Sequence, residues 1–189
     1  MTGFQERRSH ISREMERVID YLVDRKRGDK KRPPATGAAL EGAVEIHRLS
    51  LETPIDPAEM AAFKARFTEL MRTDGNRAGL GRYLGTCERD ALCGAVDGYP
   101  SACWSRSVAQ IVNDEFTPLE LLLFEPDKDL IQDIDDALKD VYKDAPPMPK
   151  NAIPDWVPTT HWWWYAPEQR EMTDWERRMH FEYDWDDWR

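Results

Sequence analysis

The three cysteines are the first residues in the chain whose spacing could indicate a specific chemistry. They are Cys87, Cys93 and Cys103, with five and nine residues between them. Structural zinc sites usually contain a pair of ligands about two to four residues apart, and no such pair occurs among these cysteines. We therefore interpret them as ordinary thiols. One disulfide is an open alternative if the protein reaches an oxidising compartment.

Two further patterns approach known catalytic motifs. The glycine-rich run at 79–85 misses the dinucleotide-binding spacing by one residue, and no Gly-Lys-Ser/Thr follows it. Asp155, Glu168 and Arg170 loosely match the carboxylates and cation with which nucleases hold magnesium. Chance matches of this kind are common in a chain with 36 acidic residues. We interpret the glycines as a turn with tight packing, and we predict no catalytic, cofactor-binding or metal-binding residue.

The histidines and serines give no stronger indication of catalysis. His10, His47, His161 and His180 form neither a His-x-x-x-His nor a His-Glu-x-x-His pattern. No serine lies in a nucleophile elbow. Enzymatic activity is the less favoured interpretation, although catalytic groups can converge from distant positions in a sequence. A metal-dependent enzyme is an alternative function, which we rank behind a structural subunit and a soluble inhibitor.

Aromatic residues dominate the C-terminal segment, which contains seven of the eight tryptophans. Rings of this size must be covered, so the segment packs either on its own chain or on a partner. If it packs on its own chain, we expect Trp162 and Trp164 to point inward and Trp163 outward. The predicted partner-binding residues are Trp162, Trp163, Trp164, Tyr165, Trp175, Trp185 and Trp188.

The net charge of −10 is distributed unevenly along the chain. Residues 1–32 carry +4, whereas residues 114–144 carry −8 and residues 168–189 carry −4. An acidic protein is a poor default partner for nucleic acid, so we do not expect direct nucleic-acid binding. The basic start and the acidic body could attract each other, within one chain or between copies.

The chain contains no apolar run long enough to span a membrane, and its first residues do not match a signal peptide. We therefore expect no membrane association. We expect a location in the cytoplasm, or in a particle assembled there.

Helical periodicity organises much of the sequence. Residues 3–27 predict an amphipathic helix that a basic, proline-containing linker follows. Asp56-Pro57 predicts the start of a second helix. The strongest pattern, at 127–142, predicts a helix that buries Leu130, Ile134 and Leu138.

The intervening segments carry weaker patterns. Residues 35–42 are small and predict a flexible segment, and residues 43–51 predict a strand. The glycine-containing segment 75–103 predicts irregular structure. Five prolines at 145–158 predict a semi-rigid connector, and Thr173 and Glu176 predict a capping box that begins a last short helix.

Together these patterns predict a helix-dominated α+β fold. Its divisions are an N-terminal amphipathic helix and basic linker at 1–34, a core domain at 40–145, and a proline-rich connector with an aromatic and acidic arm at 146–189. The terminal arms suggest a non-catalytic structural subunit of a larger protein assembly, for example a phage-like particle. Its partner would be another protein or copies of itself. The alternative is a soluble acidic inhibitor, such as an immunity protein, an antitoxin or a nucleic-acid mimic.

Overall fold

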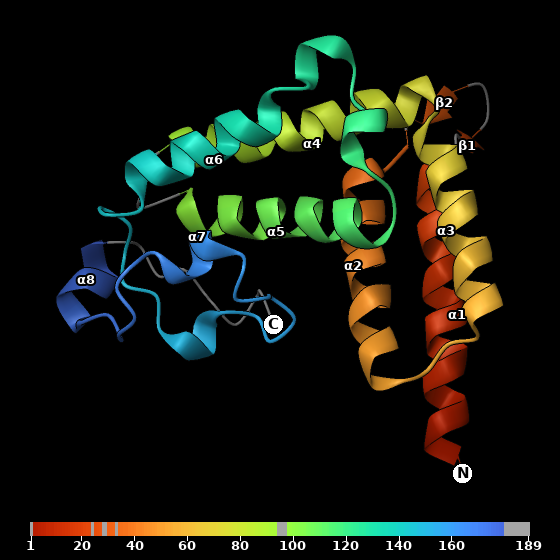
Figure 1. The fold of residues 1–189 in the computed structure, drawn as a ribbon, viewed down its shortest axis with the longest axis horizontal. Helices are drawn as coiled ribbons and strands as arrows, with labels where there is room; N and C mark the ends of the chain where they lie inside the picture. Colours follow the sequence, from red (N-terminus) through yellow and green to blue (C-terminus); the bar gives the residue numbers. More distant parts are fainter. Residues whose placement is uncertain (1, 24, 28–29, 33, 94–97, 180–189) are drawn as a thin grey trace. The chain divides into compact units, whose positions relative to one another are not determined.

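The computed structural model describes residues 2–23, 25–27, 30–32, 34–93 and 98–179. This part of the chain is mainly helical (Figure 1), and its α-helices are α1 (Thr2–Leu22), α2 (Thr36–Glu52), α3 (Pro57–Met71), α4 (Asp74–Leu92), α5 (Tyr99–Glu115), α6 (Leu130–Val141), α7 (Trp162–Tyr165) and α8 (Asp174–Met179). Three short 3-10 helices are η1 (Leu119–Leu121), η2 (Glu125–Asp127) and η3 (Lys150–Ala152). The described strands are β1 (Arg25–Arg27) and β2 (Lys30–Arg32). The predicted α+β class is therefore wrong, because two strands of three residues do not make a sheet layer.

The chain forms two compact units, each built from two segments. Unit 1 comprises residues 1–83 and 108–128, and unit 2 comprises residues 84–107 and 129–189. The boundaries fall inside α4 and α5, so each unit contains part of both helices. The predicted architecture of one core with an arm at each end is not confirmed, since both units include residues of that core.

In unit 1, α1 packs against α2 and α3 through the apolar stripe that the sequence predicted. Ile11, Met15, Val18 and Leu22 are all buried. The contact with α2 is close, because a Cβ atom added at Gly42 would lie 2.6 Å from Cγ2 of Val18. The N-terminal helix is thus an integral part of unit 1. It ends at Leu22, and the predicted continuation to residue 27 is wrong because Arg25–Arg27 forms β1.

The helix α2 replaces both the flexible segment predicted at 35–42 and the strand predicted at 43–51. Ala39, Ala43 and Ile46 are fully buried, and their spacing of four and three is that of a helix face. The β-branched residues of this segment favour a strand locally, but burial of the helical face overrides that preference.

The predicted start of α3 is confirmed. The side chain of Asp56 caps the helix by accepting a hydrogen bond from the backbone N–H of Ala58 at 2.8 Å, and Pro57 occupies the first turn.

The glycine-containing segment predicted as irregular is instead mostly helical, in α4 and the start of α5. A Cβ atom at Gly79 would collide with Thr36, whose Cβ would be 2.7 Å away. Thr36 in turn donates a hydrogen bond to Oδ1 of the fully buried Asn76 at 3.0 Å. At this position the glycine serves close helix packing and not a turn.

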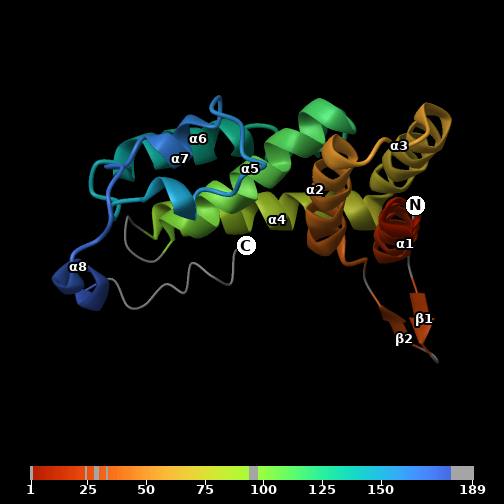
Figure 2. The same cartoon turned by 90° about the horizontal axis from the view of Figure 1, so that it is seen from below.

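The strands β1 and β2 pair antiparallel and form a hairpin between α1 and α2. Figure 2 shows this hairpin extending away from α1, α2 and α3 of the same unit. The backbone N–H of Ala35 donates to the carbonyl of Tyr21 at 2.9 Å, which joins the chain on either side of the hairpin.

In unit 2, the helix α6 buries Ile134 and Leu138 completely, as the sequence predicted, whereas Leu130 is only half-buried. The proline-rich segment also packs on the unit, because Pro146, Pro147 and Met148 are buried. The backbone N–H of Met148 donates to the carbonyl of Glu168 at 2.8 Å. This segment therefore does more than connect two parts of the chain.

Candidate functional site

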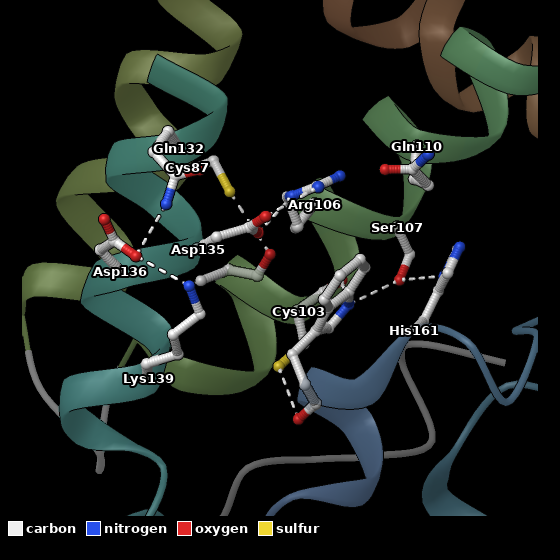
Figure 3. A network of polar contacts seen from close by, with 12 residues as sticks. Cys87, Cys103, Arg106, Ser107, Gln110, Gln132, Asp135, Asp136, Lys139 and His161 are labelled. Atoms are coloured by element: carbon white, nitrogen blue, oxygen red, sulfur yellow. Dashed lines mark hydrogen bonds and ion pairs between the residues drawn. The ribbon is translucent and has the colours of Figure 1, made fainter. Parts of the chain in front are cut away.

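A set of buried polar side chains in unit 2 lies between α5 and α7 (Figure 3). Tyr99, Cys103, Arg106 and Ser107 recur at intervals of four, three and one, so one side of α5 presents them together. The opposing segment consists of His161, which precedes α7, and the tryptophans of α7. We call this set the serine centre, because Ser107 forms hydrogen bonds with three of its members.

Ser107 is fully buried and makes three hydrogen bonds. The indole N–H groups of Trp163 and Trp164 donate to its Oγ at 2.9 and 2.8 Å. Nδ1 of His161 lies 3.0 Å from the same oxygen. A hydroxyl accepts through two lone pairs and donates one proton. The two indoles use both lone pairs, which leaves the hydroxyl proton of Ser107 to be donated to Nδ1 in the tautomer of His161 that is protonated on Nε2.

This arrangement determines what Ser107 can do chemically. A serine next to a histidine is the usual start of nucleophilic catalysis, which needs a lone pair that can reach a substrate. Both lone pairs of Ser107 are engaged by buried tryptophans, and His161 is itself only 3 % exposed. The pair is therefore arranged to hold α7 in place rather than to attack a bound molecule.

Arg106 contributes a buried guanidinium. Its Nε and one Nη donate to the two carboxylate oxygens of Asp135 at 2.7 and 3.1 Å. The same guanidinium lies 4.6 Å from the ring centroid of Trp163. A buried charge is costly unless it is paired, so the contact with Asp135 on α6 and the ring face of Trp163 together stabilise it.

The backbone of α7 is held by Tyr99 and Cys103. The hydroxyl of Tyr99 donates to the carbonyl of Trp163 at 2.6 Å, and Sγ of Cys103 lies 3.6 Å from that oxygen. Burial raises the pKa of both side chains above their ordinary values. It also raises the pKa of the Cys87 thiol to about 12. These groups therefore remain protonated at neutral pH and are poor nucleophiles.

Ring contacts complete the attachment of α7. His161 stacks on Trp163 with centroids 4.8 Å apart, and Trp162 meets Trp163 edge to face at 5.9 Å. Tyr142, at the end of α6, meets Trp162 edge to face at 6.5 Å. The run of tryptophans is thus part of the core of unit 2.

The predicted partner-binding residues differ in how far they are buried. Trp163 and Trp164 are buried, and Trp162 is half-buried. The expected outward orientation of Trp163 is wrong, because its indole donates to Ser107 and to the carbonyl of Cys103. Tyr165 is 36 % exposed and Trp175 is 68 % exposed. Trp185 and Trp188 lie outside the described residues.

Trp175 belongs to α8, and side-chain hydrogen bonds cap the N-terminus of this helix. The predicted capping box is present: Glu176 accepts from the backbone N–H of Thr173 at 2.7 Å, and Thr173 Oγ1 accepts from the N–H of Glu176 at 3.2 Å. Arg170 adds two hydrogen bonds to the same carboxylate, at 2.6 and 2.9 Å. These bonds hold the pKa of Glu176 well below its ordinary value.

The other candidate patterns do not assemble into sites. Cys87 and Cys103 are buried, Cys93 is exposed, and all three are free thiols. Glu168 pairs with Arg170 at 3.0 Å, while the bidentate contact of Arg170 is with Glu176. Within the described part of the chain, no group of three or more His, Cys, Asp and Glu side chains is placed to hold a metal ion.

Sequence reasoning did not identify Tyr99, Arg106, Ser107 or Asp135. The spacing along α5 is visible in the sequence once α5 is known to be a helix. The partners, however, are 29 to 64 residues away, and no local pattern indicates such contacts.

None of the helices in the described ranges combines the length and the apolar character that crossing a membrane requires. No protein-family model, curated protein or solved structure matches the chain.

Proposed function

We propose that the chain is a non-catalytic structural or interaction subunit of a larger protein assembly, of which a phage-like particle is one setting. The observation that carries this proposal is the exposure of Trp175. It is a large aromatic side chain, 68 % exposed, on a short helix that a capping box and Arg170 hold in place. Exposed tryptophans on a preorganised backbone are typical anchors of protein interfaces.

The serine centre supports the same proposal. Its polar groups satisfy one another, and together they fix α7 on unit 2. The described residues that follow α7, 166–179, are then presented from a base that these contacts hold in place. This arrangement reduces the entropy that a partner must overcome on binding, and low entropic cost favours an interface role.

Charge suggests the kind of surface that Trp175 would meet. Residues 168–189 hold eight acids against four arginines. A partner surface with an apolar pocket and a basic rim would complement them.

Replacement of Trp175 by serine tests the proposal. Leu92→Ser is the matched control, because Leu92 is a 66 % exposed apolar residue elsewhere in unit 2. We expect native mass spectrometry of the wild-type chain, isolated from the cells that produce it, to give complexes heavier than one chain. Trp175→Ser should shift them toward the single chain, and Leu92→Ser should not. A wild-type chain that is monomeric and without partner would contradict the proposal.

The second candidate function, a soluble acidic inhibitor, is favoured by one specific feature. Five exposed carboxylates recur along α6 and its flanks at intervals of four, three, four and four, at Asp129, Asp133, Asp136, Asp140 and Asp144. Such a stripe could cover the basic surface of a toxin or of a nucleic-acid-binding protein. An inhibitor would form a one-to-one complex with a basic partner and would not associate with itself, whereas a structural subunit forms larger assemblies.

A further inference from the structure

The hairpin of β1 and β2 pairs like charges at every position. Arg25 is opposite Arg32, Lys26 is opposite Lys31, and Arg27 is opposite Lys30. Like charges directly opposite each other destabilise an antiparallel pair. A hairpin of two short strands is at best marginally stable alone, and none of its six paired positions holds an apolar residue. Anions from elsewhere would relieve this repulsion.

The placement of the hairpin also indicates a role outside the core. The connection from α1 to α2 is closed at its base by the bond from Ala35 to Tyr21. Helix-to-helix connections of about two to eight residues are the norm. This one runs from residue 23 to residue 35, and its strands β1 and β2 extend away from α1, α2 and α3 (Figure 2).

We propose that this hairpin is a docking element that binds the acidic surface of unit 2 on a second copy of the chain. The inference rests on the proposed function and names one contact within that assembly. Unit 2 holds 9 Lys and Arg against 18 Asp and Glu, a balance of −9. Unit 1 holds 17 against 18, and six of its 17 basic residues are in the hairpin.

The acidic stripe on α6 offers the hairpin a defined target. Its five carboxylates are exposed, and within the described part of the chain one ion pair forms along the stripe, between Asp136 and Lys139 at 2.8 Å. The helix α6 has 12 residues and is about 18 Å long, because a helix rises about 1.5 Å per residue. A hairpin with three residues in each strand is about 10 Å long and fits along it.

Charge favours a second copy over nucleic acid as the partner. Both partners meet the net charge of −10, but a nucleic acid is negative along its whole length, whereas a second copy brings a basic hairpin as well as an acidic stripe. A second copy supplies the acidic surface at equal concentration. The hairpin and α6 are different surfaces, so the contact is heterologous and generates rings or filaments, as a subunit of a large assembly requires.

A charge-swap experiment tests this contact. One variant carries Lys26→Glu and Lys31→Glu, which is a cross-strand pair of the hairpin. The other carries Asp133→Lys and Asp140→Lys on α6. We expect sedimentation velocity to show that the wild type assembles in about 0.01 M salt and dissociates in about 1 M salt, where the Debye length falls from about 30 Å to about 3 Å. Each variant alone should associate at least about tenfold more weakly, and an equal mixture of the two should recover association.

The matched control reverses two exposed acids of unit 1, Glu52→Lys and Glu120→Lys, and should leave association unchanged. Circular dichroism should show that all variants fold, because the substituted acids of α6 and of the control are exposed and the hairpin lies outside the packed helices of unit 1. Association of the hairpin variant at wild-type strength would overturn the inference.

Further outcomes separate this inference from the proposed function. Assembly that survives the hairpin variant but is lost in Trp175→Ser overturns the inference alone. A wild-type chain that stays monomeric and binds no protein overturns both. The last measurement uses a labelled DNA duplex, whose binding is followed by fluorescence anisotropy. Salt-sensitive binding that is abolished by Lys26→Glu and Lys31→Glu, while self-association is unchanged, would overturn the inference. The hairpin would then be a nucleic-acid-binding element.

Discussion

The contacts inside unit 1 differ in kind from the contacts inside unit 2. In unit 1, helices approach closely where small residues allow it, as at Gly42 against Val18 and at Gly79 against Thr36. In unit 2, hydrogen bonds between side chains join α5 to α6 and to α7. Arg106 on α5 donates to Asp135 on α6. Between α5 and α7, Tyr99 donates to the carbonyl of Trp163, and Trp164 donates to Ser107. Close packing at glycines therefore contributes to unit 1, and buried hydrogen bonds between side chains far apart in the sequence contribute to unit 2.

The difference has a consequence for stability. A close helix contact fails when a residue becomes too large, and the neighbours relax only partly. A buried polar network fails when one member is removed, because the remaining groups are left without partners. Substitutions of the two kinds should therefore affect the two units unequally.

The largest effect should come from Asp135→Ala in unit 2. The substitution removes the carboxylate that accepts two hydrogen bonds from Arg106, whose side chain is 6 % exposed. Breaking a buried pair by removing one partner costs about 3–5 kcal/mol. Denaturant unfolding measures this loss. The control in unit 1 is Glu69→Ala, which removes an exposed pair with Arg66 and should cost less than about 1 kcal/mol. Equal losses would show that unit 2 does not depend on this pair.

Ser107→Ala should have the next largest effect. It removes the acceptor of Trp164 Nε1, while Trp163 Nε1 keeps its bond to the carbonyl of Cys103. An unpaired buried donor costs about 1–3 kcal/mol, and the contact between Nδ1 of His161 and Ser107 is also lost. The unfolding free energy gives the cost, and near-ultraviolet circular dichroism reports the environment of the tryptophans. Unchanged stability with unchanged spectra would mean that α7 is held by ring packing alone.

Two glycines of α4 provide the corresponding test of shape. Gly79→Ala places a methyl group against Thr36, which its hydrogen bond to Asn76 holds in place, so we expect a loss of about 1–3 kcal/mol. At Gly85 nothing lies within 4 Å of the added Cβ. Gly85→Ala should therefore stabilise the helix by up to about 1 kcal/mol. Thermal unfolding of the two variants compares them directly, and a shift of the same sign for both would contradict the assignment of Gly79 to close packing.

These residues also show how far the sequence predicts the fold. The stripes of α1 and α6 and the cap of α3 follow from local rules, and the structure confirms them. The glycines of α4 misled the prediction because a glycine breaks a helix by local preference but permits a close helix contact in three dimensions. The strand predicted at 43–51 failed because β-branched residues also fit a buried helix face.

The serine centre was not predictable for a different reason. Its hydrogen bonds join residues up to 64 positions apart, so neither periodicity nor a short motif indicates them. The aromatic run did indicate that its rings must be covered. It did not indicate that Ser107 and Arg106 would contact these rings, because polar side chains on a helix are usually exposed to solvent.

Alkaline pH should weaken unit 2 selectively. Burial raises the pKa of Cys87 to about 12, and it raises those of Cys103 and Tyr99 as well. An unfolded thiol ionises near pH about 8.5, so the buried form contributes stability that is complete below that pH and is lost as pH rises toward about 12. All three cysteines belong to unit 2. Thiol labelling should modify the exposed Cys93 quickly and reach Cys87 and Cys103 only as the pH rises. Rapid labelling of all three at neutral pH would contradict this.

The smallest effect concerns α8 at acid pH, and it compares two ways of holding a helix within unit 2. Glu176 has a lowered pKa because Arg170 and Thr173 donate to it. A lowered pKa contributes stability above the unfolded value of about 4.3, and this contribution is lost as pH falls through the folded value. Asp136 on α6 also has a lowered pKa, through Lys139 and Gln132, but α6 is held by the buried Ile134 and Leu138.

Acid should therefore loosen α8 and leave α6 intact. Hydrogen exchange, corrected for the intrinsic pH dependence, should show protection of 174–179 falling below pH about 4, while protection of 130–141 persists. Glu176→Gln should reproduce the loss at neutral pH, and Asp136→Asn should change little. Equal loss in both helices would show that the apolar stripe of α6 does not hold it independently. Retained protection in α8 would show that contacts other than the capping carboxylate hold Trp175 in place.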